Sequence, residues 1–236
     1  RQAVWRQNLA ETGKTLMETL RFWTRPASEN LPWVVDTQGA ALLDSALAKG
    51  RGVIICAPHL GNWELLNQWL ASRSPLAIVY RPPRVDWADD LIRSARGQPG
   101  VTQVRAEASG VRTLFKRLKE GGMLGILPDQ QPKRGDGEFV PFFGVSALTM
   151  SLVPRLANKT GAQVLVAFAE RLPGAKGFRV QLWEAPEEMA NDDVLVATTA
   201  MNAAIEGAIA KAPAQYQWSY KRFTIRPEGG DPIRYD

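Results

Sequence analysis

Short apolar runs, each closed by glycine or proline and separated by helix-like segments, constrain the fold of this chain most. The β-branched run from Val53 to Ala57 follows Gly52 and stops at Pro58, as expected of a buried strand. Further strands are predicted at 76–80, 123–127, 163–170 and 177–182, and helices at 44–49, 63–71, 87–95, 110–120, 149–160 and 192–211. This alternation predicts an α/β fold, with a central mostly parallel or mixed sheet flanked by helices.

Two segments lie outside this alternation. Residues 1–24 have the spacing of an amphipathic helix, with apolar Val4, Trp5, Leu9, Leu16, Met17, Leu20, Phe22 and Trp23 and basic Arg1, Arg6, Lys14 and Arg21. The basic positions are compatible with contact to an anionic membrane, and equally with a solvated face over a core stripe. The Pro- and Gly-bearing segment 132–144 is predicted to be a loop.

Composition limits the class of protein. A chain of 236 residues, 45% hydrophobic, predicts one domain over residues 1–236. Its net charge of +5 predicts an anionic partner without separating nucleic acid, phosphorylated lipid, an anionic membrane and an acidic carrier protein. Eight tryptophans fit the headgroup zone of a bilayer, although a place in the core is the better prediction for any single one of them. A single cysteine, Cys56, excludes an intrachain disulfide and predicts a buried structural thiol.

The sequence does not show how this chain would attach to a membrane. It contains neither an apolar stretch of spanning length nor a signal-peptide pattern. The chain begins at Arg1 rather than Met, so we expect either peripheral attachment or an N-terminal anchor absent from this chain.

His59 is the first candidate catalytic residue. This histidine, the only one in the sequence, follows the predicted strand and Pro58, and Glu64 comes five positions later at the start of a helix. A carboxylate that accepts from one imidazole nitrogen leaves the other free as a base. We therefore predict a dyad in which Glu64 orients His59 for activation of a hydroxyl. No serine lies in a G-x-S-x-G elbow, so the hydroxyl is expected to belong to an acceptor substrate.

A family resemblance rests on this motif and on others in order along the chain. The stretch His59-Leu60-Gly61-Asn62-Trp63-Glu64 resembles the motif of glycerolipid acyltransferases, in the version of the bacterial lipid A late acyltransferases. The accompanying motifs are Tyr80-Arg81-Pro82, the region of Arg96, Leu127-Pro128-Asp129-Gln130, Phe139-Val140-Pro141-Phe142-Phe143-Gly144, and Leu156-Ala157 with Thr160-Gly161-Ala162. The resemblance extends from about Arg6 to Trp218.

The resemblance implies a reaction and its participants. A fatty acyl chain moves from acyl carrier protein or coenzyme A to a hydroxyl of a lipid A precursor, without cofactor or metal, at the cytoplasmic face of the bacterial inner membrane. It also implies substrate-binding roles for Arg81, Arg96, Asp129 and Gln130. Asp129 and Gln130 follow a predicted strand, where a structural cap is the alternative. The run 139–143 could line an acyl groove or pack in the core.

Two other readings remain open. The same chemistry could act on another glycolipid or an aminolipid, because acceptor choice depends on pocket shape. A non-catalytic protein that binds anionic lipid is a more distant alternative. Nucleic-acid binding is not expected, because zinc-finger spacing, a Gly-rich phosphate loop and an RNP-like motif are all missing from the sequence.

Overall fold

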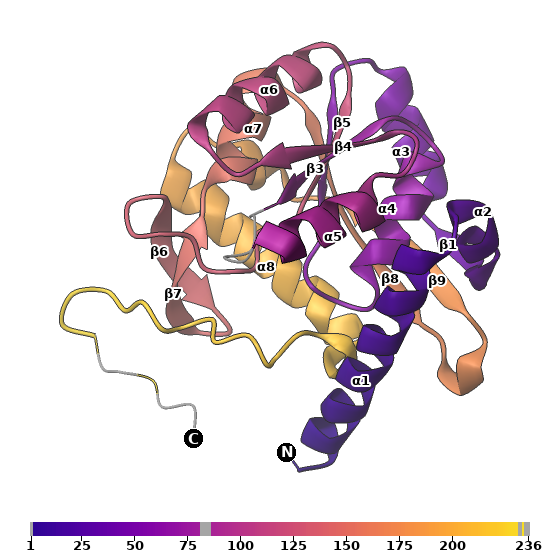
Figure 1. Ribbon diagram of the computed structural model, residues 1–236. Coiled ribbons are helices and arrows are strands. Elements are labelled where there is room, and N and C mark those ends of the chain that lie inside the picture. Colours follow the sequence, from indigo (N-terminus) through magenta and orange to yellow (C-terminus); the bar gives the residue numbers. More distant parts are fainter. Residues whose placement is uncertain (1, 81–85, 231–232, 234–236) are drawn as a thin grey trace.

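The central sheet has seven strands among the described residues, in the order β1-β9-β8-β2-β5-β3-β4 (Figure 1). The computed structural model describes residues 2–80, 86–230 and 233. The strands are β1 (Val34–Gln38), β2 (Val53–Cys56), β3 (Leu76–Tyr80), β4 (Val101–Arg105), β5 (Met123–Ile126), β8 (Gln163–Arg171) and β9 (Phe178–Glu184). Neighbours from β8 to β4 run parallel, whereas β9 is antiparallel to β8. The predicted α/β fold with a mostly parallel, mixed sheet is confirmed.

Helices cover both faces of this sheet. The α-helices are α1 (Gln2–Thr24), α2 (Ala27–Asn30), α3 (Ala40–Ala48), α4 (Trp63–Ala71), α5 (Asp86–Arg96), α6 (Ala108–Lys119), α7 (Leu152–Thr160) and α8 (Val194–Lys211). The core on one face includes residues of α1, α3 and α4, and the core on the other includes residues of α6, α7 and α8. Among the described helices, none is both long and apolar enough to span a bilayer.

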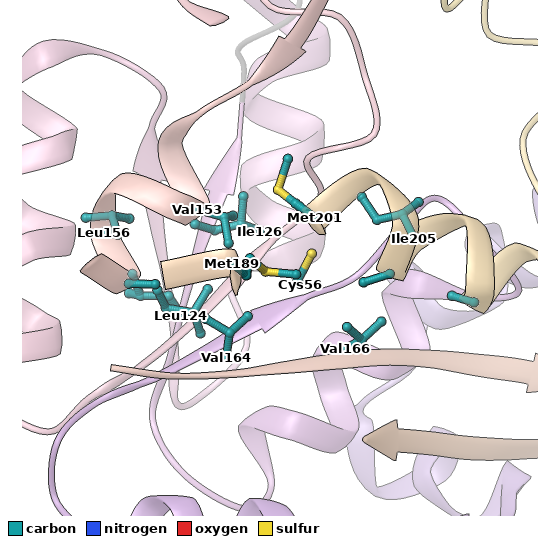
Figure 2. Close-up of a cluster of buried hydrophobic side chains, with 14 of the residues drawn as sticks. Cys56, Leu124, Ile126, Val153, Leu156, Val164, Val166, Met189, Met201 and Ile205 are labelled. Atoms are coloured by element: carbon teal, nitrogen blue, oxygen red, sulfur yellow. The ribbon is translucent and has the colours of Figure 1, made fainter. Parts of the chain in front are cut away.

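Strand β2 shows how the sequence produces two cores. Its four residues are all buried, and their side chains alternate between the two faces. Val53 and Ile55 join the α1–α3–α4 side, while Ile54 and Cys56 join the α6–α7–α8 side. Figure 2 shows Cys56 in this second core, near Met201 of α8. A strand buried on both faces therefore reads as a continuous apolar run. Cys56 is fully buried, which confirms the predicted structural thiol.

Several element bounds were predicted closely. The helix at 63–71 and the strand at 76–80 match α4 and β3, and residues 2–24 form α1. The predicted helix at 44–49 begins earlier, at Ala40, after Gly39 in a left-handed conformation. The predicted helix at 149–160 begins later, at Leu152, because residues up to Met150 belong to β7.

The prediction of a loop at 132–144 is wrong for residues 137–142 and correct for 132–136 and for the turn at 143–144. Residues 137–142 form strand β6 (Gly137–Phe142), which pairs antiparallel with β7 (Val145–Met150). Phe143 and Gly144 connect them with φ angles of 48° and 73°, the backbone required by a two-residue hairpin turn. Because Phe-Gly is not a common sequence for this turn and Pro141 argues against a strand, the hairpin was missed.

Candidate active site

His59 lies in a turn between β2 and α4. Leu60 N–H donates to Pro58 O, Gly61 N–H to Gln215 O and Asn62 N–H to Ala169 O. At Gly61, where φ is +62°, a Cβ would lie 1.9 Å from the carbonyl oxygen of Ala169. Only glycine fits this close approach, so the sequence fixes the turn that presents the imidazole.

Asp129 reaches His59 from the neighbouring strand. The parallel register of β2 and β5 pairs Cys56 with Ile126, and each strand continues through two residues, the second a proline, to the polar side chain. His59 and Asp129 therefore stand at the same offset beyond paired residues. Asp129 Oδ1 lies 2.8 Å from His59 Nδ1, and Oδ2 accepts from the His59 backbone N–H at 3.0 Å.

The environment keeps Asp129 ionised. Its side chain is 2% exposed, and this burial alone would raise the pKa. The charge interaction with His59, together with hydrogen bonds from its ring and backbone, outweighs burial and holds the pKa of Asp129 below its ordinary value. Burial, and then the negative charge of Asp129, raise the pKa of Tyr216, so this phenol stays neutral.

The second ring nitrogen of His59 is available as a base. A carboxylate only accepts hydrogen bonds, so Nδ1 carries the proton and Nε2 keeps its lone pair. Gln130 Nε2 lies 3.4 Å from His59 Nε2 and 3.3 Å from Gln217 Oε1. The Trp63 ring packs edge-on against the imidazole, with centroids 5.0 Å apart. Together these contacts fix the ring while one nitrogen stays reactive.

The expected pairing of His59 with Glu64 is corrected by the structure. Glu64, 4% exposed, accepts from Arg96, whose Nε lies 3.1 Å from each carboxylate oxygen and whose Nη2 also donates to Oε1. Glu64 is the second residue of α4, and Arg96 is the last residue of α5. The carboxylate therefore binds a guanidinium between two helices, while Asp129 takes the place beside the imidazole.

A pocket of about 290 Å³ adjoins His59. Its lining combines polar His59, Asn67, Arg96, Gln130 and Gln131 with Trp63, Ile78, Val79, Tyr80, Ile92, Ala106, Ile126, Leu127 and Met150. The lining is thus mostly apolar, with the polar groups contributed by His59, Arg96 and the residues after β5. This combination suits a ligand that has an alkyl chain beside a reacting polar group.

The other predicted site residues fall in different places. Gln130 lies at the pocket, next to the imidazole. Arg81 lies outside the described residues. The run 139–143 contributes no residue to the pocket lining; Val140 and Phe142 are buried, and Phe142 belongs to the core beside α8. Packing is therefore the correct alternative for Phe142.

Helix α1 supports the turn that carries His59. The sequence did not predict this contact. Arg171, 8% exposed on β8, donates to Glu11, Thr15 and Glu18 of α1. Glu18 Oε2 also accepts from Asn62 Nδ2 at 3.1 Å, and Asn62 Oδ1 caps α4 through Leu65 N–H. The only sequence signal was the spacing of Glu11, Thr15 and Glu18, which places them on one helical face.

A second segment behind the histidine was also missed. Gln217 N–H donates to His59 O at 3.0 Å, and Asn8 Nδ2 of α1 donates to the carbonyls of Ala214 and Tyr216. Residues near the C-terminus therefore complete the site, and no local pattern in the sequence predicted this contact.

An imidazole held by a buried carboxylate, at the carboxyl edge of a mostly parallel sheet and beside a pocket, is an arrangement typical of α/β enzymes. The chain belongs to the bacterial lipid A biosynthesis acyltransferase family, whose model matches residues 1–224. The chain is accordingly an acyltransferase that acts in lipid A biosynthesis.

The chain is also similar in sequence to individual acyltransferases of known name. The chain is 30% identical over 235 residues to lipid A biosynthesis lauroyltransferase of Escherichia coli (strain K12), and 28% identical over 233 residues to the palmitoleoyltransferase of the same organism. Both alignments cover 97% of this chain and 74% of the relative. A shorter match, 28% over 127 residues, is to phosphatidylinositol mannoside acyltransferase of Mycobacterium tuberculosis and covers 52% of this chain and 40% of that one.

Proposed function

We propose that this protein transfers a fatty acyl chain from a thioester, on acyl carrier protein or coenzyme A, to a hydroxyl of a lipid A precursor. The observation that carries the proposal is the position of the His59 ring at a pocket, with Nδ1 bound to buried Asp129 and only the Gln130 amide near Nε2 among the described residues. We also place the reaction at the cytoplasmic face of the bacterial inner membrane and propose that it needs neither cofactor nor metal.

The proposed reaction has two proton transfers at one nitrogen. His59 Nε2 takes the proton of the acceptor hydroxyl as its oxygen attacks the thioester carbonyl. The tetrahedral intermediate then expels the thiolate, the C–S bond breaks, and Nε2 returns the proton to sulfur. The charge on Asp129 stabilises the imidazolium between these steps. Ester and free thiol are the products.

Direct transfer is favoured over an acyl-enzyme route. None of the described residues that line the pocket is a serine, threonine or cysteine. Cys56 lies nearby in sequence, but burial, and then the charge of Asp129, raise the pKa of its thiol, which disfavours the nucleophilic thiolate. The acceptor hydroxyl is therefore proposed to attack the thioester itself.

Arg96 is proposed to bind the developing negative charge or a substrate phosphate. Glu64 occupies its Nε and Nη2 donors, whereas Nη1 has no hydrogen-bond partner within the described part of the chain. A guanidinium fixed on one side by a carboxylate keeps a donor oriented toward a ligand. Glu64 is thus proposed to position Arg96, and Gln130 to contact substrate beside Nε2. Substrate binding by Arg81 stays a prediction.

Replacing Glu64 by glutamine should show whether Glu64 positions Arg96 or orients His59. The amide still accepts from Arg96 but removes the opposing charge from a largely buried guanidinium, so we expect stability to fall by about 1–3 kcal/mol. Activity should fall, with the effect concentrated in the KM of the lipid acceptor. Because the His59–Asp129 contact is unchanged, the pH profile of kcat should keep its wild-type shape. Steady-state kinetics and thermal unfolding would measure this, and a changed pH profile would return Glu64 to the role of base-orienting group.

Helix α1 presents an apolar outer face, which supports membrane contact. Its exposed large apolar side chains, each at least half exposed, are Trp5, Leu9, Leu16, Met17 and Leu20. Arg6 and Lys14 are exposed on the same helix. Trp23, expected on this face, is instead half-buried, with its ring 5.9 Å from the Arg96 guanidinium. We propose that the outer face of α1 lies on an anionic bilayer.

Liposome flotation tests this contact. Wild-type protein should float with anionic vesicles at low salt, because the apolar face inserts and the cations add attraction, and it should float less with neutral vesicles. Leu16→Asp should reduce flotation strongly. The matched control is Gln7→Asp, which adds the same charge at an exposed position on the other side of the helix. Equal flotation by wild type and Leu16→Asp would remove α1 as the membrane-contacting element.

A second candidate function is the same transfer to another glycolipid, favoured by the match to a phosphatidylinositol mannoside acyltransferase. Purified protein, mixed with an acyl thioester and either a lipid A precursor or a phosphatidylinositol mannoside, distinguishes the two by product mass. The proposal predicts a one-acyl mass increase for the lipid A precursor. Acylation of the mannoside alone would favour the second candidate.

A further inference from the structure

The surface of α6 carries exposed positive charges that no close ion pair neutralises among the described residues. Arg112, Lys116 and Lys119 are exposed along this helix. Arg112 and Lys119 form no ion pair with a described residue, and Lys116 approaches Glu120 only to 3.8 Å, with both side chains mostly exposed. Such an exposed pair is weak, so the helix presents a positive field to solvent.

A polar hollow lies between helix α5 and the edge strand β4. It encloses about 780 Å³ and is lined by Tyr80, Asp90, Arg93, Ser94, Val101, Thr102, Gln103 and Arg105. Arg105 contacts Asp89 at 3.2 Å, and Asp90 lines the hollow beside Arg93, so the charges of the hollow are largely balanced and the excess positive charge lies on α6. Tyr80 lines both this hollow and the catalytic pocket. The two are therefore neighbours.

The helix starts at the catalytic pocket and leads away from it. Ala106 lines the pocket, and α6 begins two residues later, at Ala108. With a rise of 1.5 Å per residue, Arg112 lies about 6 Å and Lys119 about 16 Å from the start of the helix. The positive charge thus extends from the mouth of the pocket over a length that exceeds a small-molecule contact.

We propose that this α6 surface, defined by Arg112, Lys116 and Lys119, docks an acidic acyl carrier protein that presents the thioester to His59. The inference deepens the proposed function and rests on it. Complementary charge steers such encounters and fixes their orientation. A coenzyme A thioester would reach only the cations nearest the pocket, whereas a folded acidic carrier can cover the whole row.

A bilayer is a poorer occupant for this surface. Val111 is the one large apolar residue exposed on the described part of α6, compared with five on α1. Helices α1 and α6 also lie at opposite ends of the molecule, at the bottom and the top of Figure 1. If α1 faces lipid, α6 faces the aqueous side, where a soluble carrier would arrive.

Charge reversal on α6 tests the proposal. We would compare wild-type protein, the double variant Arg112→Glu/Lys116→Glu, and the control Lys176→Glu, which reverses an exposed charge in the β8–β9 connection. The double variant should raise the KM for acyl carrier protein thioester about tenfold, with kcat nearly unchanged. The KM for coenzyme A thioester should change less than about threefold, and the control should match wild type.

Binding of the acidic carrier gives a readout that does not depend on turnover. Fluorescence anisotropy of labelled acyl carrier protein should show wild-type binding that weakens with salt and is weaker still in the double variant. Unchanged binding and KM in that variant, or an equal KM increase for the lipid acceptor, would overturn the docking surface. Carrier binding without product from either donor would instead count against the proposed function.

Discussion

His59→Ala is expected to lower acyl transfer by roughly 10²–10⁴-fold, the contribution typical of a general base. The imidazole is the only described group that combines a free basic nitrogen with a position at the pocket. Its side chain is 15% exposed and packs mainly against Trp63 and Asp129, so the alanine variant should remain folded. Initial rates with purified protein, beside circular dichroism and a melting curve, would measure both effects.

One result would count against His59 as the base. A folded His59→Ala protein with wild-type turnover would exclude proton transfer by this residue. A variant that melts far below wild type would leave the rate uninformative, so His59→Gln provides a second test. Glutamine keeps a hydrogen-bonding side chain but cannot accept the proton, and it should be as inactive as alanine.

Asp129→Asn should reduce turnover by an amount on the order of 10³-fold. An amide beside Nδ1 no longer favours the tautomer with its proton on Nδ1, and it cannot stabilise the imidazolium. The substitution is nearly isosteric, so the loss should appear in kcat more than in KM. A rate within a fewfold of wild type would show that Asp129 does not orient His59.

The same carboxylate predicts a pH effect on stability. Because the folded-state pKa of Asp129 lies below its ordinary value, its ionised form contributes stability above the unfolded pKa of about 3.9. That contribution is lost as pH falls through the folded pKa. Wild-type stability should therefore decline below about pH 4, and Asp129→Asn should show a shallower decline. Urea unfolding at a series of acid pH values would measure the difference.

Four of the five strands that the sequence predicted are buried on both faces, and the fifth, β9, is fully buried only at alternate residues. Strands β2, β3, β5 and β8 are continuous apolar runs because helices cover both of their sides. Strands β1 and β4 lie at the sheet edges, where their burial is only partial. Their sequences, Val-Val-Asp-Thr-Gln and Val-Thr-Gln-Val-Arg, lack a clear period of two. Pairing with one neighbour holds them in the sheet, and that pairing is not visible locally.

The sequence identified residues of the candidate site but did not identify which of them contact one another. The motif placed His59 and Glu64 together because they are close along the chain, but helix α4 directs Glu64 toward Arg96. Asp129 was expected near the site only as a substrate-binding residue. The equal offsets of His59 and Asp129 beyond Pro58 and Pro128 gave a signal, which becomes interpretable only once β2 and β5 are known to be neighbours.

The contacts by which α1 supports the turn of His59 also could not be predicted, because they too depend on the tertiary structure. Arg171 contacts Glu11 and Glu18, which lie more than 150 positions earlier in the sequence. Long-range ion pairs of this kind depend on the order of strands in the sheet and on which face α1 covers. The spacing of the acidic residues identified a helical face but not its partner.

His59 is proposed to act as the base when this protein transfers an acyl chain to a lipid A precursor. The most direct measurement is mass spectrometry of the lipid A fraction from cells that lack this protein and from cells in which it is restored. Loss of the protein should remove the mass of one acyl chain, and wild-type protein should restore it while His59→Ala does not. An unchanged lipid A mass in cells lacking the protein, or equal restoration by His59→Ala, would contradict the account.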